Sequence, residues 1–274
     1  MMFAKKMSIL NWLCEREFSG RYTFSFQEVQ ADFPSMPRRI VQNELNRLVR
    51  KKDITAVHKG FYVRIPAHYM KREWMPPDFY IDQLMKYLGK PYYIGLLSAG
   101  ELLGAAHQRP QRFCVFTTFP VANTSERTNP IIAWNYRRSI PEELLLRKNS
   151  ETGEIRYSNA ELTALDLVQY SQYIGGLSRA ATVLAELLEK TDFKHASATL
   201  FSVGTVTAFQ RLGYIIEEIL GDATQAEDLY LRMQDAHKTF RWIALSREVK
   251  SAEVFAKNAR WHIVVNTKLE VDDL

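Results

Sequence analysis

The chain has 274 residues, of which 46% are hydrophobic and 24% are charged. This composition is sufficient for a buried core and excludes a disordered chain, and the length fits two domains. No uncharged run is long enough to span a membrane, and the short apolar stretch at 7–14 lacks the features of a secretory signal. Cys14 and Cys114 make neither a disulfide framework nor a zinc site, so we expect a cytoplasmic protein.

Positive charge is concentrated at the N-terminal end. Residues 1–72 contain 14 Lys and Arg against 6 Asp and Glu, whereas the other 202 residues contain 22 against 25. A small basic segment joined to a larger, slightly acidic one suggests a module that binds a polyanion. A solvated basic surface would give the same count, so charge alone does not decide the matter.

The first predicted elements are two helices separated by a short strand. Apolar residues near the N-terminus recur at intervals of four, three and four, which predicts an amphipathic helix. They are Phe3, Met7, Leu10 and Cys14, reinforced by Ile9 and Leu13. Residues 22–24 then resemble a strand, and Ser25 with Glu28 forms a capping-box pattern that begins a second helix. Its expected core residues are Phe26, Val29 and Phe33.

The third predicted helix, residues 37–52, carries the most informative pattern. Its expected apolar stripe is Ile40, Val41, Leu45, Leu48 and Val49. The opposite side is rich in arginine and amide side chains, which have the donor and acceptor geometry to read guanine and adenine edges in the major groove. The predicted DNA-binding residues of this helix are Arg38, Arg39, Gln42, Asn43, Asn46, Arg47 and Arg50. The favoured base contacts are Arg39, Gln42, Asn43 and Asn46.

A hairpin completes the N-terminal pattern. Residues 54–57 and 60–65 alternate like two strands, with His58 and Lys59 in the turn between them. Helix, short strand, helix, helix and hairpin is the order of a winged helix-turn-helix, whose hairpin wing contacts phosphate or the minor groove. His58 and Lys59 are therefore predicted DNA contacts. A winged helix that binds only protein is the alternative, and the basic composition favours DNA.

Pro66, Pro76 and Pro77, together with a lack of periodicity, mark residues 67–77 as a linker. The expected domains are therefore a winged helix-turn-helix at 1–66 and a larger mixed α/β domain at 78–274, which together make an α+β protein. In the larger domain we expect helices at 80–88, 94–107, 159–173, 180–188 and 206–220, strands at 112–118, 131–136, 154–157 and 261–265, and a polar loop at 122–129. Ser158 to Glu161 forms a second capping-box pattern.

The larger domain lacks a recognisable catalytic pattern. It has no phosphate-binding or dinucleotide-binding glycine motif, and the glycines of residues 95–100 do not form a nucleophile elbow. The six histidines, His107 among them, never fall at metal-ligand spacing. Asp192 and His195 are close in sequence, but no nucleophile accompanies them. Asp166 lies among apolar residues and is expected to be a buried carboxylate with a partner such as an arginine. We predict no enzyme activity, catalytic residue, metal or cofactor.

Several stretches resemble one family, the AbiEi antitoxins of bacterial type IV toxin–antitoxin systems. They are residues 60–63 (GFYV), 91–99 (PYYIGLLSA), 104–108 (GAAHQ), 161–168 (ELTALDLV), 175–177 (GGL) and 210–214 (QRLGY). They occur in the family's order along nearly the whole chain.

This resemblance implies two activities. The winged helix would bind inverted repeats of double-stranded DNA in its own promoter and repress the operon. The domain at 78–274 would counteract a nucleotidyltransferase-type toxin from the same operon without a stable toxin complex, in a system of phage resistance by abortive infection. The resemblance supplies no catalytic residue.

Two other classes of function remain open. One is a ligand-responsive winged-helix transcription regulator whose C-terminal domain senses a small molecule, since buried helices and aromatic residues allow a pocket. The other is an enzyme that acts on nucleic acid or on a partner protein. A carboxylate cluster with a metal would favour the enzyme.

Overall fold

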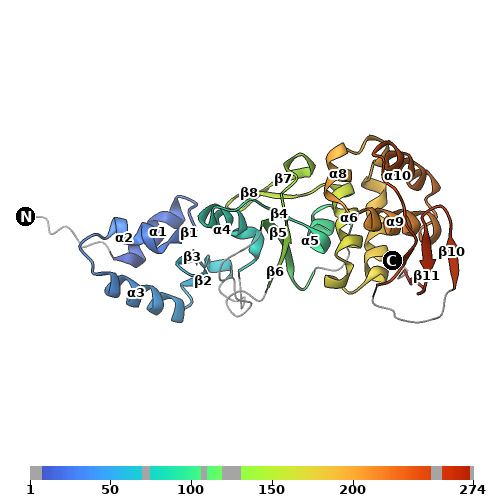
Figure 1. The fold of residues 1–274 in the computed structure, drawn as a ribbon. Coiled ribbons are helices and arrows are strands. Elements are labelled where there is room, and N and C mark those ends of the chain that lie inside the picture. The colour runs from blue at the N-terminus through green and yellow to red at the C-terminus, as the bar shows by residue number, and fades with distance from the viewer. Residues whose placement is uncertain (1–7, 70–74, 106–109, 119–130, 248–254, 272–274) are drawn as a thin grey trace, which may run out of the picture. The chain divides into compact units, whose positions relative to one another are not determined.

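The computed structural model describes residues 8–69, 75–105, 110–118, 131–247 and 255–271. Helices and short strands are mixed along the chain (Figure 1), which confirms the predicted α+β fold class. The chain forms two compact units. Unit 1 consists of residues 1–92, 117–138 and 147–156, and unit 2 consists of residues 93–116, 139–146 and 157–274. None of the described helices is long and apolar enough to cross a membrane.

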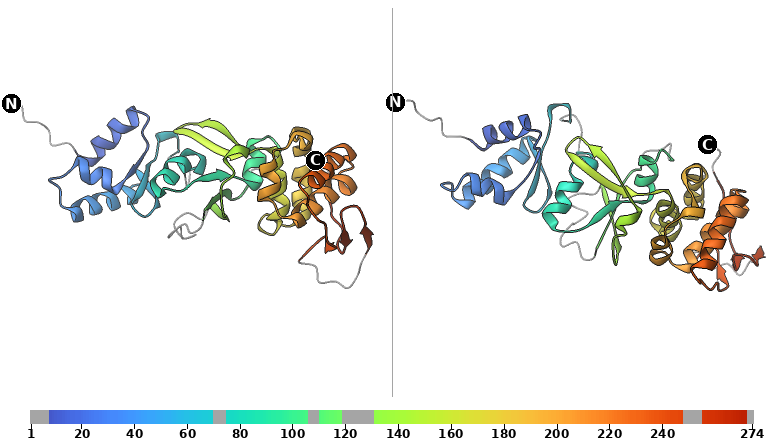
Figure 2. Two further views of the ribbon diagram at one scale, coloured as in Figure 1. Left: turned by 45° about the horizontal axis from the view of Figure 1, so that its top comes forward. Right: turned by 90° about the horizontal axis from the view of Figure 1, so that it is seen from above.

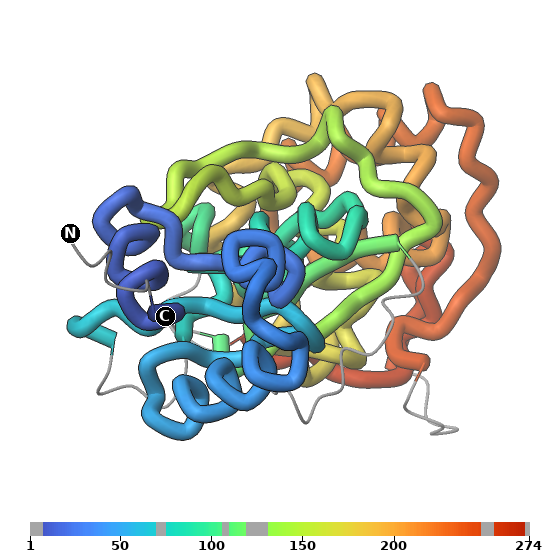
Figure 3. The backbone as a smooth tube through the Cα atoms, turned by 90° about the vertical axis from the view of Figure 1, so that its left-hand side faces the viewer, coloured from blue at the N-terminus to red at the C-terminus, as the bar shows by residue number. Residues whose placement is uncertain are grey.

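Unit 1 begins with three helices and three strands in the order of a winged helix-turn-helix. They are α1 (Ile9–Phe18), β1 (Thr23–Ser25), α2 (Phe26–Asp32), α3 (Arg38–Arg50), β2 (Ile54–His58) and β3 (Phe61–Arg64). The strands form an antiparallel sheet in the order β1-β3-β2. Figure 3 shows the three helices, in blue, wound against one another. The predicted helices and hairpin are therefore present, with ends that differ by a few residues.

One hydrophobic core holds the winged helix together. Val41, Leu45 and Leu48 of α3 are fully buried in it. The Phe24 ring stacks on Tyr62 with centroids 5.5 Å apart. Burial of each such apolar side chain stabilises the fold by about 1.5–3 kcal/mol. The capping box at the start of α2 is confirmed, because Ser25 and Glu28 each accept the other's backbone N–H.

Two predicted apolar faces are wrong in part. The buried residues of α1 are Ile9, Trp12 and Leu13, whereas Leu10 and Cys14 are partly buried, and Phe3 and Met7 lie outside the described residues. The helix turns toward Trp12, because its indole is buried and its N–H donates to Asp32 at 2.7 Å. On α3, Ile40 is 50% exposed and does not belong to the buried stripe.

The rest of unit 1 packs around aromatic side chains. Phe79 lies edge-on to Tyr22 and to Tyr69, with centroids 5.2 and 5.7 Å apart. The Tyr69 hydroxyl donates to Glu151 at 2.8 Å. Two short 3-10 helices, Ala67–Tyr69 and Pro77–Phe79, lie within the predicted linker or at its end, and residues 70–74 are outside the described part. The division of function between residues 1–66 and 78–274 stays a prediction.

A five-stranded sheet has the order β6-β5-β4-β8-β7. Its strands are β4 (Tyr92–Ile94), β5 (Phe113–Thr118), β6 (Ile132–Arg137), β7 (Leu145–Ser150) and β8 (Gly153–Ser158), and the adjoining helices are α4 (Ile81–Leu88) and α5 (Leu96–Leu102). The predicted helix at 94–107 is therefore shorter and follows a strand. His107 and the predicted loop at 122–129 lie outside the described residues. Strand β7 was not predicted, because its mostly exposed side chains lack a core-facing alternation.

Unit 2 contains the α-helices of the C-terminal half of the chain and a π-helix, coloured yellow to orange in Figure 2. They are α6 (Ala160–Gln169), α7 (Leu177–Leu187), α8 (Ala198–Val203), α9 (Val206–Tyr214), a π-helix (Ile215–Ile219) and α10 (Ala223–Asp235). A small sheet in the order β10-β11-β9 contains β9 (Ile243–Ala244), β10 (Ala256–Asn258) and β11 (Ile263–Val265).

Two details of α6 differ from expectation. Its N-cap is Asn159, whose side chain accepts the Leu162 N–H, so the predicted Ser158 capping box is wrong. Glu161 instead accepts the backbone N–H of Asp192. Asp166 is fully buried, as predicted, but a hydroxyl donates to it where an arginine was suggested: the Tyr93 O–H lies 2.8 Å from its carboxylate.

Helix α9 approaches Trp261 very closely. A Cβ on Gly213 would lie 2.1 Å from the Trp261 ring, and the indole is fully buried. The indole N–H donates to Glu217, and the Trp261 carbonyl accepts from Gln210. A glycine is therefore required where the helix meets this ring.

Candidate nucleic-acid interface

Helix α3 is amphipathic, with one face buried in the core and the other face polar and exposed. Val41, Leu45 and Leu48 fix the helix in the core, so the residues between them must point outward. Six of the seven predicted helix residues are exposed, namely Arg38, Arg39, Gln42, Asn43, Asn46 and Arg50. Arg47 is partly exposed, with 42% of its side-chain surface accessible. The structure therefore brings the predicted α3 residues together on the outer side of one helix.

Several of these side chains already have neighbours within the winged helix. The Arg38 guanidinium lies 4.9 Å from the centroid of the Phe26 ring. Gln42 donates an amide hydrogen bond to Asn46 at 3.2 Å. Such contacts hold flexible side chains in place and reduce the conformational entropy that ligand binding would cost. Within the described chain, no side-chain partner is found for Arg39 or Asn43.

Arg47 is held by the only acid of α3. Its guanidinium donates two hydrogen bonds to Glu44, at 2.8 and 2.5 Å. The hydrogen bond from Arg47 lowers the pKa of Glu44 below its ordinary value, and the same bond raises the pKa of Arg47. Both groups are therefore charged at neutral pH, and one negative charge sits at the edge of the polar face.

The wing is the β2–β3 hairpin, with Lys59 and Gly60 at its tip. Gly60 has a φ of +76°, a conformation that favours glycine. Lys59 is exposed, whereas His58 is partly buried. Tyr87 of α4 packs beside the wing, with its ring 6.2 Å from His58 and 5.1 Å from Phe61. This contact was not predicted from the sequence, because α4 is distant along the chain.

Some of the basic residues of the N-terminal segment form ion pairs within the domain and stabilise its fold. The Arg64 side chain is 11% exposed and pairs with Glu17 and Asp53. Arg16 is 15% exposed, pairs with Glu28 and lies over the Trp12 ring. The charge excess of the N-terminal segment therefore overstates the charge available to a ligand, and the exposed arginines of α3 account for much of the accessible part.

The described residues include no group of three or more His, Cys, Asp or Glu side chains able to hold a metal ion. Asp192 and His195 form an exposed hydrogen-bonded pair at 2.8 Å, which lowers the pKa of Asp192. Both side chains are largely exposed, and the pair caps a short 3-10 helix.

Comparison with known families matches the middle part of the chain. Residues 93–218 match the AbiEi antitoxin C-terminal domain. This match supports the predicted resemblance to the AbiEi antitoxins. At family level this supports a role as an antitoxin and transcriptional regulator, and AbiEi is not an enzyme family.

The fold of this chain is also found in a solved structure. The crystal structure of the RV2827C protein from Mycobacterium tuberculosis aligns with a TM-score of 0.66 and 12% identity, over 92% of this chain and 89% of that one. At this identity the likeness shows a shared fold. A comparison with curated proteins gives no match.

Proposed function

We propose that this protein is a DNA-binding autorepressor and an antitoxin. In this proposal α3 enters the major groove of inverted repeats in the protein's own promoter. The remainder of the chain counteracts a nucleotidyltransferase-type toxin encoded in the same operon. The match of residues 93–218 to the AbiEi antitoxin C-terminal domain supports the pairing of the two activities.

The observation that carries the DNA-binding part is the outer side of α3. Arginine and amide side chains are exposed there together, while the opposite side is fixed in the core. Arginine can pair bidentately with guanine, and asparagine or glutamine with adenine. Arg39, Gln42, Asn43 and Asn46 are the proposed base contacts. Arg38, Arg47 and Arg50 lie beside them and complete the proposed interface.

The wing has a different proposed role in DNA binding. Lys59 is exposed at its tip and would contact phosphate, while His58 lies at the base of the turn. A phosphate contact adds affinity for any sequence, whereas a base contact discriminates between sequences. The two kinds of residue should therefore differ in how their loss affects binding.

The test is fluorescence-anisotropy titration of the full chain with promoter DNA and with a scrambled duplex. Arg39→Ala or Asn43→Ala should cost about 1–3 kcal/mol on the promoter and little on the scrambled duplex. Lys59→Ala should weaken both equally and reduce the log–log salt slope by about 0.9. Arg241→Ala, which removes an exposed charge from unit 2, is the matched control. Equal affinity of the wild-type protein for both duplexes would refute specific repression.

The antitoxin part is tested in cells. A neighbouring nucleotidyltransferase-like gene should arrest growth when expressed alone and should be harmless when this chain is co-expressed. Continued arrest in the presence of the folded full-length protein would contradict the proposal. Absence of copurification would not, because the proposed neutralisation requires no stable complex.

A further inference from the structure

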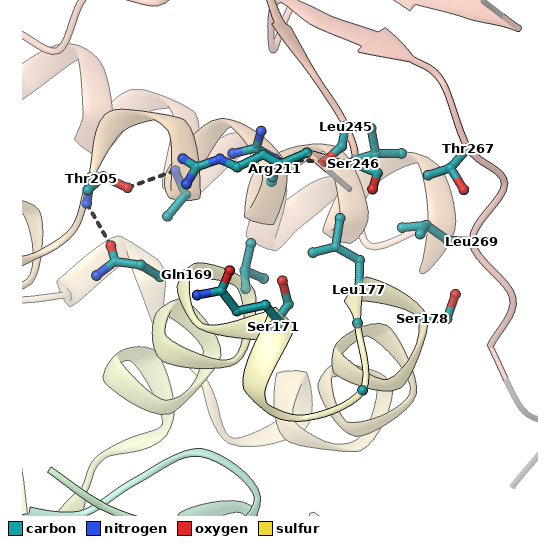
Figure 4. A pocket seen from close by; sticks show the side chains of 16 residues that line it. Gln169, Ser171, Leu177, Ser178, Thr205, Arg211, Leu245, Ser246, Thr267 and Leu269 are labelled. Carbon is teal, nitrogen blue, oxygen red and sulfur yellow. Dashed lines mark hydrogen bonds between the residues drawn. The ribbon is translucent and has the colours of Figure 1, made fainter. Parts of the chain in front are cut away.

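Unit 2 contains a pocket of about 300 Å³ (Figure 4). Its walls are the end of α6, the loop before α7, the start of α9, and the segments around 245–247 and 267–269. The volume lies at the lower end of the range for small-molecule sites. None of the described lining residues is acidic, although two are arginines.

The first of these, Arg211, is buried and has no counter-ion among the described residues. Its exposed fraction is 6%, and no carboxylate of the described chain lies within ion-pair distance. Three of its five N–H groups donate to the backbone carbonyls of Leu245, Ala244 and Thr207. The other two have no acceptor among the described residues. A buried cation without an opposite charge is costly, and a bound anion would remove that cost.

The second arginine, Arg247, is exposed at the same pocket. Its guanidinium donates to the Thr207 hydroxyl at 3.0 Å. Burial and the charge of Arg247 together lower the pKa of Arg211 to about 10, which leaves Arg211 cationic at neutral pH. Two cations that repel each other are thus held side by side, which is the arrangement that attracts an anion.

The opposite wall offers backbone donors. Helix α7 begins after Gly175 and Gly176, whose φ angles are +99° and +97°. No side chain caps this helix start, so its first N–H groups and the positive end of its dipole are available to an anion. The Ser171 and Ser178 side chains lie on the same side of the pocket, and the Ser178 hydroxyl accepts the Glu270 N–H.

We propose that this pocket binds the phosphate group of a small phosphomonoester. Donors from two arginines and a helix start approach from different directions, which suits a tetrahedral oxyanion better than a planar carboxylate. Leu177, Leu245 and Leu269 supply apolar wall beside these donors. That wall would contact the organic part of the ligand.

The test is isothermal titration calorimetry of the full-length protein, without DNA or toxin. Its outcome is therefore independent of the function proposed above. The probes are inorganic phosphate, ribose 5-phosphate and adenosine 5′-monophosphate, with adenosine as the phosphate-free control. We expect saturable binding of the three phosphate probes in competition with one another, tighter for the two esters, and no binding of adenosine.

Variants locate the site. Arg247→Gln removes a charge-assisted hydrogen bond donor and should weaken binding about tenfold or more. Arg241→Gln removes an exposed arginine outside the pocket and should change affinity less than about twofold. Thr267→Asp adds a negative charge to the lining and should weaken binding as strongly as Arg247→Gln, which gives a second reading should one variant fold poorly.

Three results would overturn the proposal. The first is no saturable binding of any phosphate probe to the wild-type protein. The second is an equal loss of affinity in Arg247→Gln and Arg241→Gln, which would indicate general charge attraction. The third is binding of inorganic phosphate with exclusion of both esters, because the pocket would then not accept the organic group.

Discussion

Glu44 is the residue whose charge most directly opposes the proposed DNA contact. It lies on α3 among arginines and amides, and its two hydrogen bonds from Arg47 occupy a cation that could otherwise reach a phosphate. The hydrogen bond from Arg47 lowers the pKa of Glu44 below its ordinary value of 4.5. The ion pair between Glu44 and Arg47 is therefore intact in the folded protein at any pH above 4.5. The stability it contributes is lost only as the pH falls through the lowered pKa.

Replacement of Glu44 by glutamine should therefore strengthen DNA binding at neutral pH. The change removes a negative charge from the interface and releases Arg47, so we expect a gain of a few-fold on promoter and scrambled DNA alike, with a steeper salt dependence. Fluorescence anisotropy over a series of salt concentrations measures this. Glu154→Gln, which removes an exposed acid paired with Arg147, is the control. Weaker DNA binding by Glu44→Gln would show that the pair positions Arg47 for contact.

The two cysteines should differ sharply in reactivity. Cys114 is 5% exposed, and burial raises the pKa of its thiol to about 11. Because the thiolate is the reactive form, Cys114 should resist iodoacetamide at pH 8 in the folded protein, whereas the partly buried Cys14 should be modified faster. Mass spectrometry of digested samples over time measures each rate. Similar rates for both cysteines in native protein would contradict the burial of Cys114.

Two single residues show what could and could not be predicted from the sequence. Asp166 was expected to be buried because apolar residues surround it, and it is. Its hydroxyl partner, Tyr93, could not be inferred, since 73 residues separate the two. Ile40 was assigned to the apolar stripe of α3, but it is half exposed. Helical spacing alone includes residues at the edge of the stripe that do not reach the core.

At the scale of elements, α3 was predictable because its apolar residues recur with helical spacing and its opposite side is polar. Its register can be tested with two matched truncations. Leu48→Ala should cost about 2–5 kcal/mol because it leaves a cavity in the core. Ile40→Ala should cost well under about 1 kcal/mol, because half of that side chain is already exposed. Denaturant unfolding of the full chain measures both, and equal destabilisation would mean that Ile40 contributes to the core.

Helix α9 depends on a contact that the sequence did not reveal. Gly213 lies within the predicted helix at 206–220, and the absence of a side chain at this position leaves room for Trp261. Gly213→Ala should destabilise the protein by about 1–3 kcal/mol, because the buried ring cannot move without strain. Trp261→Phe leaves a smaller ring at this site, so the double variant should be less destabilised than the sum of the single changes. Strict additivity in a double-mutant cycle would show that the two sites do not touch.

Strand β7 marks the limit of element prediction. Four of its six residues are exposed, so its sequence has no alternation of polar and apolar side chains that would indicate a strand. It is defined by its place at the edge of the five-stranded sheet, next to β8. Hydrophobic periodicity detects elements that face a core on one side, and this edge strand does not. The central strand β4 was also not predicted. All three of its residues are buried, so it too lacks an alternation of polar and apolar side chains.

At the scale of the whole molecule, the proposed function requires two activities that can be lost separately. The residues proposed to read DNA are confined to α3 and the wing in unit 1, whereas most of the AbiEi match lies in unit 2. Exposed polar residues on α3 contribute little to the core, so their replacement should leave the fold intact. A variant that fails to bind DNA should therefore remain an antitoxin.

We expect the triple variant Arg39→Ala, Gln42→Ala, Asn43→Ala to lose promoter repression while it still rescues cells from the toxin. A reporter fused to the promoter measures repression, and colony counts after toxin induction measure rescue. Because repression also sets the protein level, both strains must express the antitoxin from the same foreign promoter, with immunoblots to match the amounts. Loss of rescue at equal protein level would show that antitoxicity acts through DNA binding, and retention of repression would place the DNA-reading residues elsewhere.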